Sequence, residues 1–430
     1  MANTFITRTP SSAGNKKTFT LSVWVKRTTL GSDYILTARN GTGSLDAFYF
    51  GFRNNQIQID STASGGDKAL TFRSNALYRD TFGWYNIILA VDTTQSTASD
   101  RAKLYVNGSQ ITSFEISTYP DQNDDFYGIN DTIVHSFGRE HFASGTAYHE
   151  YLLSHIHFID GTAYDASTFG ETDATTGEWK IKTSPSVTYG TNGFFILKDG
   201  NSVTDQSGNG NNFTVGGGTL TNTEDCPSNV FATLNPLVYE SRDNTFSNGN
   251  NTITGGGSDD WTNKYGTSTI APSSGKYYVE AKLITKVNSQ AIIGLISTSQ
   301  AISGSLKDFG VFALETEGRL VGSGSNIQTG LTAFSNGDIA GLAFDATNGT
   351  AQFYRNGSTY GNPLSSIPSD TYYFATTTYY TGGVINFNFG NGYFGTTAVA
   401  SAGTNASGNG IFEYDVPTGY TALSTKGLNL

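Results

Sequence analysis

Oxygen-bearing side chains alternate with other residues in one glycine-rich segment, Asp205-Gln206-Ser207-Gly208-Asn209-Gly210-Asn211. Carboxylate, hydroxyl and amide oxygens at alternate positions of a loop are typical of calcium-binding loops. The segment has one carboxylate, however, and the twelfth position from Asp205 is Gly216 in place of a glutamate. Two interpretations stay open: a calcium site with Asp205 and Asn209 as ligands, or a turn that Asx side chains stabilise without a metal. We expect no cofactor, with calcium as the alternative.

Histidines and acidic residues offer two further kinds of chemistry. All five histidines lie between residues 135 and 157, and His155 and His157 would share one face of a strand close to Glu150, as in a metal site. A partly buried strand explains the same pattern.

Glycoside hydrolysis needs two positioned carboxyl groups. The only Glu-x-Glu pair, Glu315 and Glu317, fits a solvent-exposed strand as well.

Nucleophilic catalysis has no support in the sequence. There is no Gly-x-Ser-x-Gly motif, and the single cysteine, Cys226, lies beside Pro227 with no histidine near it in sequence. We therefore expect that the protein is not an enzyme.

Tyrosines in polar loops are the better candidates for a binding surface. A tyrosine ring buries a large area at low entropic cost and keeps a hydrogen-bonding hydroxyl, which suits both sugars and protein partners. The segment Thr376–Gly383 places Tyr379 and Tyr380 between two apolar strands, as at a loop tip. We predict that Tyr379, Tyr380, Tyr127 and Tyr148 bind a ligand. The alternative is that these rings lie in the core.

The elements that must position these residues are strands. Lys103–Val106 and Gln352–Arg355 are short alternating runs, and each ends in Asn-Gly, the strongest local signal of a β-hairpin. The chain contains 28 Phe, 24 Tyr and 51 Gly, but no sustained helical periodicity. The fold class is therefore predicted to be all-β, with two β-sandwich domains of related design in tandem.

Composition excludes several classes of function. The net charge of −11 and the absence of a basic stripe argue against nucleic-acid binding. One cysteine cannot form an intrachain disulfide bond. No apolar stretch is long enough to span a bilayer, and the N-terminus lacks the pattern of a signal peptide. We expect a protein without membrane insertion.

In the first half, the Trp-led segment Trp84–Asp92 is followed by Leu104-Tyr105-Val106-Asn107-Gly108. In this order the two segments resemble the concanavalin A-like/laminin-G jelly roll. The segments Phe158–Ala163, Phe169–Glu171 and Asp205–Asn211 are similar to jelly-roll proteins of tailed, especially marine, bacteriophages. Glycanases with this fold use a Glu-x-Asp-x-Glu strand, which this sequence lacks.

The second half contains, in this order, Gly275–Glu280, Ile292–Leu295 and Gly337–Asp345 with Phe353–Gly357. These segments resemble successive motifs of the SPRY-type β-sandwich. Tyr278 stands where the family often has Trp. The expected division is a jelly roll over residues 1–225, a linker over 226–243 and a SPRY-like β-sandwich over 244–430.

The resemblance implies a bacteriophage virion protein on the particle surface, made in the host cytoplasm. As a tail fibre, spike or capsid decoration it would bind a carbohydrate or another host receptor. Its expected partners are other virion proteins, a host surface glycan or receptor, and further copies of itself in a homo-oligomer. The alternatives are a purely structural cement protein and a glycan-degrading enzyme.

Overall fold

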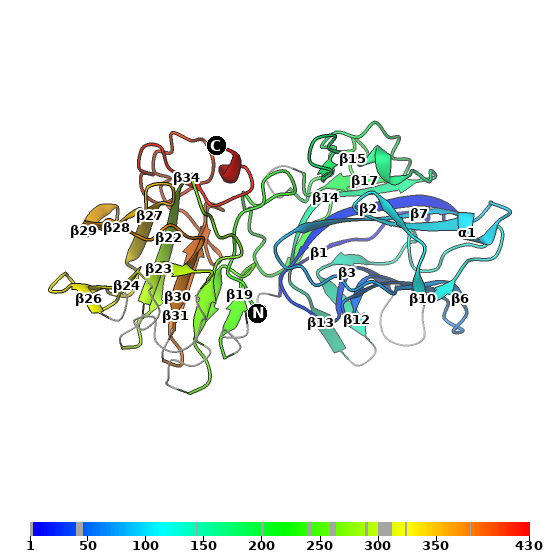
Figure 1. Cartoon of the computed structure of the whole chain (residues 1–430). Coiled ribbons are helices and arrows are strands. Elements are labelled where there is room, and N and C mark those ends of the chain that lie inside the picture. The colour runs from blue at the N-terminus through cyan, green and yellow to red at the C-terminus, as the bar shows by residue number, and fades with distance from the viewer. Residues whose placement is uncertain are drawn as a thin grey trace. The chain divides into compact units, whose positions relative to one another are not determined.

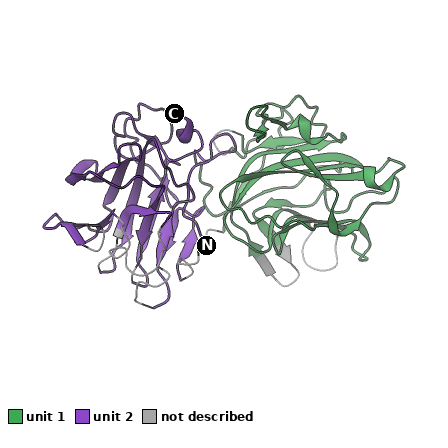
Figure 2. Ribbon diagram, in the orientation of Figure 1, with its two compact units in different colours: residues 1–222 green, residues 223–430 purple. Residues whose placement is uncertain are grey.

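The computed structural model describes residues 3–39, 46–142, 145–198, 202–238, 243–258, 264–288, 291–299, 312–322, 325–378 and 380–430. The chain forms two compact units, unit 1 (Met1–Asn222) and unit 2 (Thr223–Leu430) (Figure 2). Strands dominate both units (Figure 1), which confirms the all-β fold class. The described residues contain one short α-helix, α1 (Ala98–Arg101), and the 3-10 turns η1 (Ala166–Thr168) and η3 (Gly427–Asn429). Within these ranges, no helix has the length and apolar character needed to cross a membrane.

Unit 1 contains two large antiparallel sheets. The eight-stranded sheet has the order β10 (Phe114–Thr118), β6 (Lys68–Ser74), β5 (Gln56–Thr62), β4 (Ala47–Arg53), β3 (Asp33–Arg39), β11 (His135–Phe137), β1 (Phe5–Arg8), β18 (Thr214–Gly217). The six-stranded sheet has the order β17 (Phe194–Ile196), β14 (Tyr151–Asp160), β2 (Thr18–Arg27), β7 (Trp84–Asp92), β8 (Ala102–Val106), β9 (Ser109–Ile111). Two hairpins accompany them: β12 (Arg139–Phe142) with β13 (Gly145–Tyr148), and β15 (Gly170–Thr172) with β16 (Trp179–Ile181).

Alternation along the strands builds the core of unit 1. In β2, Phe19, Leu21 and Val23 are fully buried, and in β4 Phe48 and Phe50 are fully buried as well. These residues come from different sheets and belong to one apolar cluster. The two sheets of unit 1 therefore form a sandwich, and every second residue of β4 points away from the core.

Unit 2 contains two sheets as well. One has the order β19 (Thr245–Ser247), β20 (Thr252–Thr254), β31 (Val384–Asn388), β22 (Lys276–Thr285), β27 (Ile339–Asp345), β28 (Thr350–Arg355), β29 (Ser358–Leu364), with β34 (Thr421–Ala422) beside β22. The other has the order β21 (Tyr265–Thr267), β30 (Tyr372–Thr377), β23 (Ala291–Ser297), β24 (Phe312–Glu315), β25 (Arg319–Gly322), β26 (Ser325–Gln328). A small hairpin pairs β32 (Tyr393–Phe394) with β33 (Thr397–Ala398).

The two units share one strand order. In unit 1, the sheet order β14-β2-β7-β8-β9 corresponds to β31-β22-β27-β28-β29 in unit 2. The order β11-β3-β4-β5-β6 corresponds in the same way to β30-β23-β24-β25-β26. The related design that the two Asn-Gly turns suggest thus extends to the connectivity of both sheets.

Both Asn-Gly turns have the predicted hairpin conformation. The φ angles are 45° and 79° at Asn107 and Gly108, and 48° and 79° at Asn356 and Gly357. Each asparagine carboxamide oxygen accepts a hydrogen bond from a preceding strand, from Asn86 N at 2.8 Å in unit 1 and from Ile339 N at 2.8 Å in unit 2.

An irregular segment covers one outer sheet face in each unit. In unit 1, Phe169 and Trp179 pack on Ile88 and Ile159 of the six-stranded sheet. In unit 2, Phe412 and Val416 pack with Tyr278 and Ala343. Each cover also places an aromatic ring against the hairpin glycine: a Cβ on Gly108 would lie 2.4 Å from Trp179, and one on Gly357 2.6 Å from Tyr414.

The expected linker over residues 226–243 differs from the structure. Compact unit 2 begins at Thr223, and Phe231 and Leu234 are buried in it. Ala232 N donates to Leu423 O at 2.9 Å, and Leu234 N to Asn250 O at 2.9 Å. Apolar burial therefore makes residues 226–234 part of unit 2, although Pro227 and the lack of periodicity resemble a connection.

Candidate functional site

The outer face of the eight-stranded sheet of unit 1 carries one polar residue from every strand in a single register row. Strand pairing aligns these residues across the sheet, on the side away from Phe48 and Phe50. We call them the polar row: Thr214, Thr7, Ser136, Thr37, Tyr49, Asp60, Thr71 and Thr118. Seven of the eight side chains end in a hydroxyl and one in a carboxylate. Ser136, Thr37 and Thr71 are buried, and the other five residues are partly or fully exposed.

Two tyrosines form an aromatic centre on this face, the tyrosine pair Tyr34 and Tyr49. Their ring centroids are 5.3 Å apart with an interplanar angle of 49°, and both residues are half-buried. Burial raises the pKa of Tyr34 to about 12 and also raises the pKa of Tyr49. Both phenols are therefore neutral hydrogen-bond donors at physiological pH. Arg39 Nη1 donates to Tyr49 Oη at 3.1 Å and orients that hydroxyl.

A β-bulge and a glycine bring the tyrosine pair together. The pairing of β3 with β4 shifts between Tyr34 and Leu36, and Tyr34 faces Gly51 across the strands. A Cβ on Gly51 would lie 2.4 Å from Asp33 O, so no larger residue fits against the bulge. The absent side chain at Gly51 allows the Tyr34 ring to approach Tyr49.

A hydrogen-bonded chain of polar side chains continues from the tyrosine pair to the sheet edge. Asp60 accepts hydrogen bonds from Thr71 Oγ1 at 3.0 Å and from the amide of Gln58. Gln58 in turn accepts from Arg73 Nε at 2.7 Å, and Arg73 donates to Glu115 at 3.2 Å. Gln58 is buried, and its hydrogen bonds hold the partly exposed Asp60 and Arg73 in fixed directions, as sugar-binding surfaces require.

At the other end of this face, a histidine lies between two acidic residues. His149 Nδ1 lies 3.4 Å from Asp33 Oδ1, and His149 Nε2 lies 3.8 Å from Glu140 Oε2. Burial raises the pKa of Glu140, whose side chain is almost inaccessible. Burial alone would lower the pKa of His149, but Asp33 and Glu140 outweigh it, so the net shift is upward. We call these three residues the His149 cluster.

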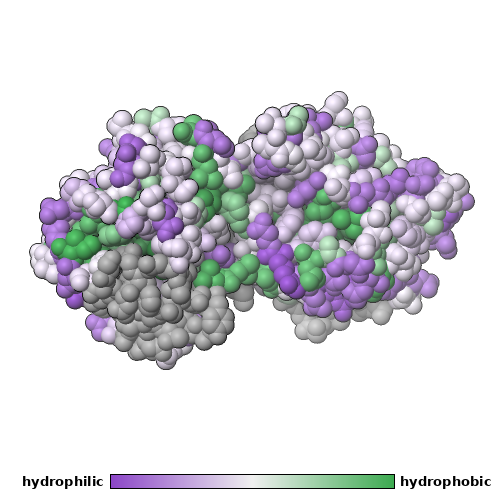
Figure 3. Space-filling view, in the orientation of Figure 1, coloured by the Kyte–Doolittle hydropathy of each residue, from purple (hydrophilic) through white to green (hydrophobic). Residues whose placement is uncertain are grey.

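Hydrophilic residues gather over the part of unit 1 between the positions labelled β12 and β10 in Figure 1, as the space-filling view shows (Figure 3). This agrees with the polar side chains of β5, β6 and β10. The signal for this face was present in the sequence, because Tyr49, Gly51 and Arg53 alternate with three phenylalanines. The pairing of Tyr34 with Tyr49 depends on the bulge, which alternation does not reveal.

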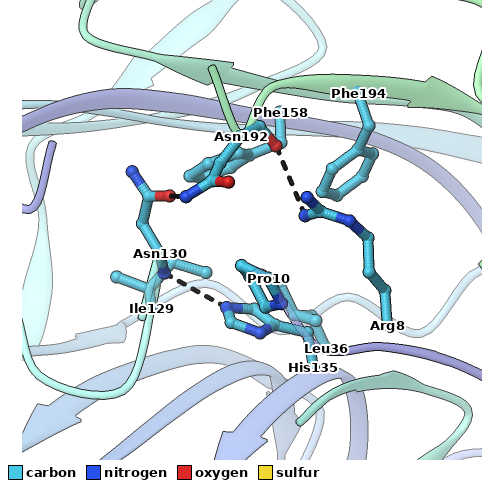
Figure 4. A pocket seen from close by; sticks show the side chains of 9 residues that line it. All are labelled: Arg8, Pro10, Leu36, Ile129, Asn130, His135, Phe158, Asn192 and Phe194. Carbon is cyan, nitrogen blue, oxygen red and sulfur yellow. Dashed lines mark hydrogen bonds between the residues drawn. The ribbon is translucent and has the colours of Figure 1, made fainter. Parts of the chain in front are cut away.

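A small pocket lies at one end of the unit 1 sandwich (Figure 4). Its volume of about 10 Å³ is close to that of one water molecule. Asn130 N donates to His135 Nε2 at 3.1 Å, and Asn192 Nδ2 donates to Asn130 Oδ1 at 2.9 Å, so the polar atoms of its wall bond to one another. Burial lowers the pKa of His135 to about 4, which keeps the imidazole neutral. The pocket is too small for a sugar.

The histidines predicted for a metal site are part of an aromatic layer. His157 stacks on Phe195 with centroids 3.9 Å apart, and its Nδ1 lies 2.9 Å from Tyr189 Oη. Burial lowers the pKa of His157 well below its usual value. Among the described residues, no three His, Cys, Asp or Glu side chains are grouped so that they could hold a metal ion.

Glu315 differs from its interpretation as an exposed residue. It is 3% exposed, and its Oε2 lies 2.5 Å from Arg319 Nη2. Its partner comes from the next strand, because β24 pairs with β25 in a tight hairpin.

The loop proposed for calcium is satisfied by its own protein atoms. Asp205 accepts hydrogen bonds from Phe195 N at 2.8 Å, Ser207 N at 2.9 Å, Ser207 Oγ at 2.7 Å and Asn211 N at 2.9 Å. Asn209 Nδ2 donates to Gly190 O at 2.6 Å and Gly193 O at 3.0 Å. Both carboxylate oxygens face N–H or O–H donors, which does not fit a cation site. The arrangement is a chain of Asx and Ser turns.

The same loop recurs in unit 2 as Asn405-Ala406-Ser407-Gly408-Asn409-Gly410. Ser407 N donates to Asn405 Oδ1 at 3.2 Å, and Asn409 N donates to Ser407 Oγ at 3.2 Å, as Asn209 N does to Ser207 Oγ at 3.2 Å. The common pattern Asx-x-Ser-Gly-Asn-Gly was available in the sequence as an internal repeat.

This geometry predicts that Asp205→Asn destabilises unit 1. The amide group would set an NH₂ against an N–H that now donates to the carboxylate, so the free energy of unfolding should fall by about 1–3 kcal/mol. Differential scanning calorimetry measures the change. In the matched control Asp165→Asn little change is expected, because only Oδ1 of Asp165 accepts hydrogen bonds, from Ser167 N and Oγ. An increase in wild-type melting temperature on adding calcium would contradict the metal-free interpretation.

The four predicted tyrosines come from both units of the chain. Tyr379 lies outside the described residues, and Tyr380 is a half-buried residue of unit 2. Tyr127 of unit 1 has its backbone N–H bonded to Ser61 Oγ at 2.8 Å. Tyr148 lies beside Phe5, with ring centroids 5.9 Å apart. Their roles in binding stay predictions.

Comparison with known proteins finds a family match within unit 1. Residues 3–145 match the family model described as the concanavalin A-like lectin/glucanases superfamily, in agreement with the resemblance of the first half. No curated protein matches the chain. Among solved structures, the chain is similar to the SPRY domain of human HERC1, with 16% identity over 36% of this chain and 96% of that chain and a TM-score of 0.29. It is also similar to the TRIM65 PSpry domain, with 12% identity over 36% of this chain and 88% of that chain and a TM-score of 0.30.

Proposed function

We propose that the protein is a non-enzymatic adhesion component of a bacteriophage virion, and that the outer face of the eight-stranded sheet of unit 1 binds a host surface glycan. The observation that carries the proposal is the tyrosine pair beside Asp60 and Arg73, which the buried amide of Gln58 orients through hydrogen bonds. Aromatic faces stack on the apolar C–H faces of sugars, and planar amides and carboxylates bond their hydroxyls. The match of residues 3–145 to a lectin/glucanase superfamily supports the same class of ligand.

The net charge of the chain favours a neutral glycan. Arg73 is paired with Glu115 at 3.2 Å, and Arg39 is turned to the Tyr49 hydroxyl. The chain as a whole carries a net charge of −11, which would repel an acidic polysaccharide. Binding should therefore depend only weakly on salt concentration.

We predict that Tyr34→Ala and Tyr49→Ala each weaken glycan binding about fivefold, because loss of one stacked ring removes about 1 kcal/mol. A polysaccharide microarray followed by isothermal titration calorimetry measures the effect, with cellohexaose and laminarihexaose as defined neutral probes. Tyr164→Ala is the matched control, since this half-buried tyrosine lies in the cluster that covers the other sheet.

Three outcomes of this experiment distinguish the alternatives. Wild-type binding by both variants, with loss in Tyr379→Ala combined with Tyr380→Ala, would move the site to the loop of unit 2. Absence of binding to every glycan would favour a structural cement protein. Release of reducing sugars would favour a glycan-degrading enzyme.

A further inference from the structure

His149 stands where it can influence the proposed glycan-binding face. It follows β13, and its side chain is 8% exposed. The acidic partners come from two other strands, Asp33 from β3 and Glu140 from β12. Two segments distant in the sequence, β3 and the β12–β13 hairpin that His149 follows, therefore meet at one imidazole ring.

The geometry of the His149 cluster favours the imidazolium form. Both ring nitrogens of His149 face carboxylate oxygens, at 3.4 Å and 3.8 Å. Only the doubly protonated ring can donate on both sides, whereas a neutral ring directs one lone pair at a carboxylate. Deprotonation would also leave the buried carboxylate of Glu140, which is 1% exposed, without its cationic neighbour on that side.

The same imidazole touches the aromatic centre of the face. Its ring lies edge-on to Tyr34, with centroids 6.1 Å apart and an interplanar angle of 79°, and it stacks on Tyr151 at 6.3 Å. The Tyr151 hydroxyl donates to Tyr34 O. His149 therefore supports the Tyr34 ring, while Tyr151 holds its backbone.

Other charged groups around the cluster are already engaged. Arg27 Nη2 lies 3.3 Å from Asp33 Oδ2, and Arg27 Nη1 donates to Tyr78 O at 2.6 Å. Arg39 attracts Glu140 and donates to Tyr49. Tyr34 and Tyr151 are neutral because burial raises the pKa of both. His149, whose pKa Asp33 and Glu140 raise from its usual value, is thus a group in this corner whose charge changes near neutral pH.

We propose that protonation of His149 positions Tyr34, so that the glycan-binding face is in its competent arrangement at mildly acidic pH and loses it as the pH rises. The inference rests on the proposed function of this face. A group whose pKa is raised by two carboxylates keeps its proton below its folded pKa and loses the stabilising contacts above it. By linkage, a ligand that needs Tyr34 in place also raises the proton affinity of His149.

Nuclear magnetic resonance on the full chain tests the positioning step without any ligand. Histidine-selective ¹³C labelling follows five residues, and His149→Gln assigns the His149 signal. We expect His149 to titrate above 6.5, and the ring signals of Tyr34 to shift with the same midpoint. Glu140→Gln should lower that midpoint, whereas the control Glu115→Gln, an acid on the edge strand of the same sheet, should leave it unchanged. A measured pKa of His149 at or below 6.5 would overturn the inference. So would Tyr34 signals that do not change as His149 titrates.

Calorimetry with cellohexaose and laminarihexaose from pH 5.5 to 8.5 tests the coupling to binding. Affinity for the sugar should fall about fivefold as the pH rises through the titration midpoint of His149. This pH dependence should vanish in His149→Gln. Binding that is equally tight at all pH values would overturn the coupling. If neither sugar binds at any pH while Tyr34 still follows His149, the proposed function fails for these glycans and the positioning role of His149 stands.

Discussion

Replacing Gly108 or Gly357 by valine is expected to unfold the unit that contains it at moderate temperature and leave the other unit intact. A β-branched residue at φ 79° costs about 1–3 kcal/mol by itself. The new side chain must also displace a covering ring, since even a Cβ would lie 2.4 Å from Trp179 or 2.6 Å from Tyr414. Together the two terms should lower the free energy of unfolding by about 3–5 kcal/mol.

The two terms can be separated with a matched glycine. Gly66 of unit 1 has φ 91° and open space around a built Cβ, so Gly66→Val measures the backbone cost without the clash. Calorimetry should show one shifted transition for each hairpin variant and a smaller shift for the control. Equal shifts in melting temperature for Gly108→Val and Gly66→Val would show that the clash with Trp179 adds nothing to the loss of stability.

Removing the Glu280 carboxylate should have a similarly large effect on unit 2. Glu280 is fully buried on β22, and it accepts hydrogen bonds from Glu413 N at 2.9 Å, Tyr414 N at 3.0 Å and Tyr278 Oη at 3.2 Å. Glu280→Ala leaves these donors without an acceptor at the point where the covering segment meets the sheet. At about 1–3 kcal/mol for each buried unsatisfied group, a loss of about 3–5 kcal/mol is expected.

The pH dependence of unit 2 provides an independent check on Glu280. Burial raises the pKa of Glu280 to about 7, above the value near 4.3 of an unfolded glutamate. The folded state therefore binds more protons between these values, and this contribution to stability is lost as the pH rises from about 5 to 7. Thermal unfolding of unit 2 across that range should lose this slope in Glu280→Ala. A slope that persists in the variant would assign it to another group.

The local elements could be predicted from the sequence because their signals lie within a few residues. Trp84–Asp92 is a strand with the expected bounds, and Asn107-Gly108 and Asn356-Gly357 are hairpin turns. In each hairpin strand, the alternation of residue types over four positions predicts which side of the strand is buried. Such signals depend on nearest neighbours in the chain, which the sequence shows directly.

The site could not be assembled in the same way, because its contacts depend on register between distant strands. Tyr34 meets Tyr49 through a bulge, and His149 meets Asp33 across 116 residues of sequence. The error at residues 226–234 has a related cause, since burial of Phe231 and Leu234 depends on partners near residues 424 and 250. Glu315 was interpreted as exposed because nothing in its own strand identifies Arg319 of the next strand as its ion-pair partner.

The polar row lies on a sheet face, and the pocket of unit 1 has room for about one water molecule. A ligand on an open sheet face keeps much of its surface in water, so each copy of the chain would hold a sugar weakly and release it quickly. Tight attachment would then come from avidity, because a second copy on the same particle meets its sugar at a high effective concentration. Such an arrangement permits a particle to move over a glycan layer by exchanging individual contacts while staying attached through the rest.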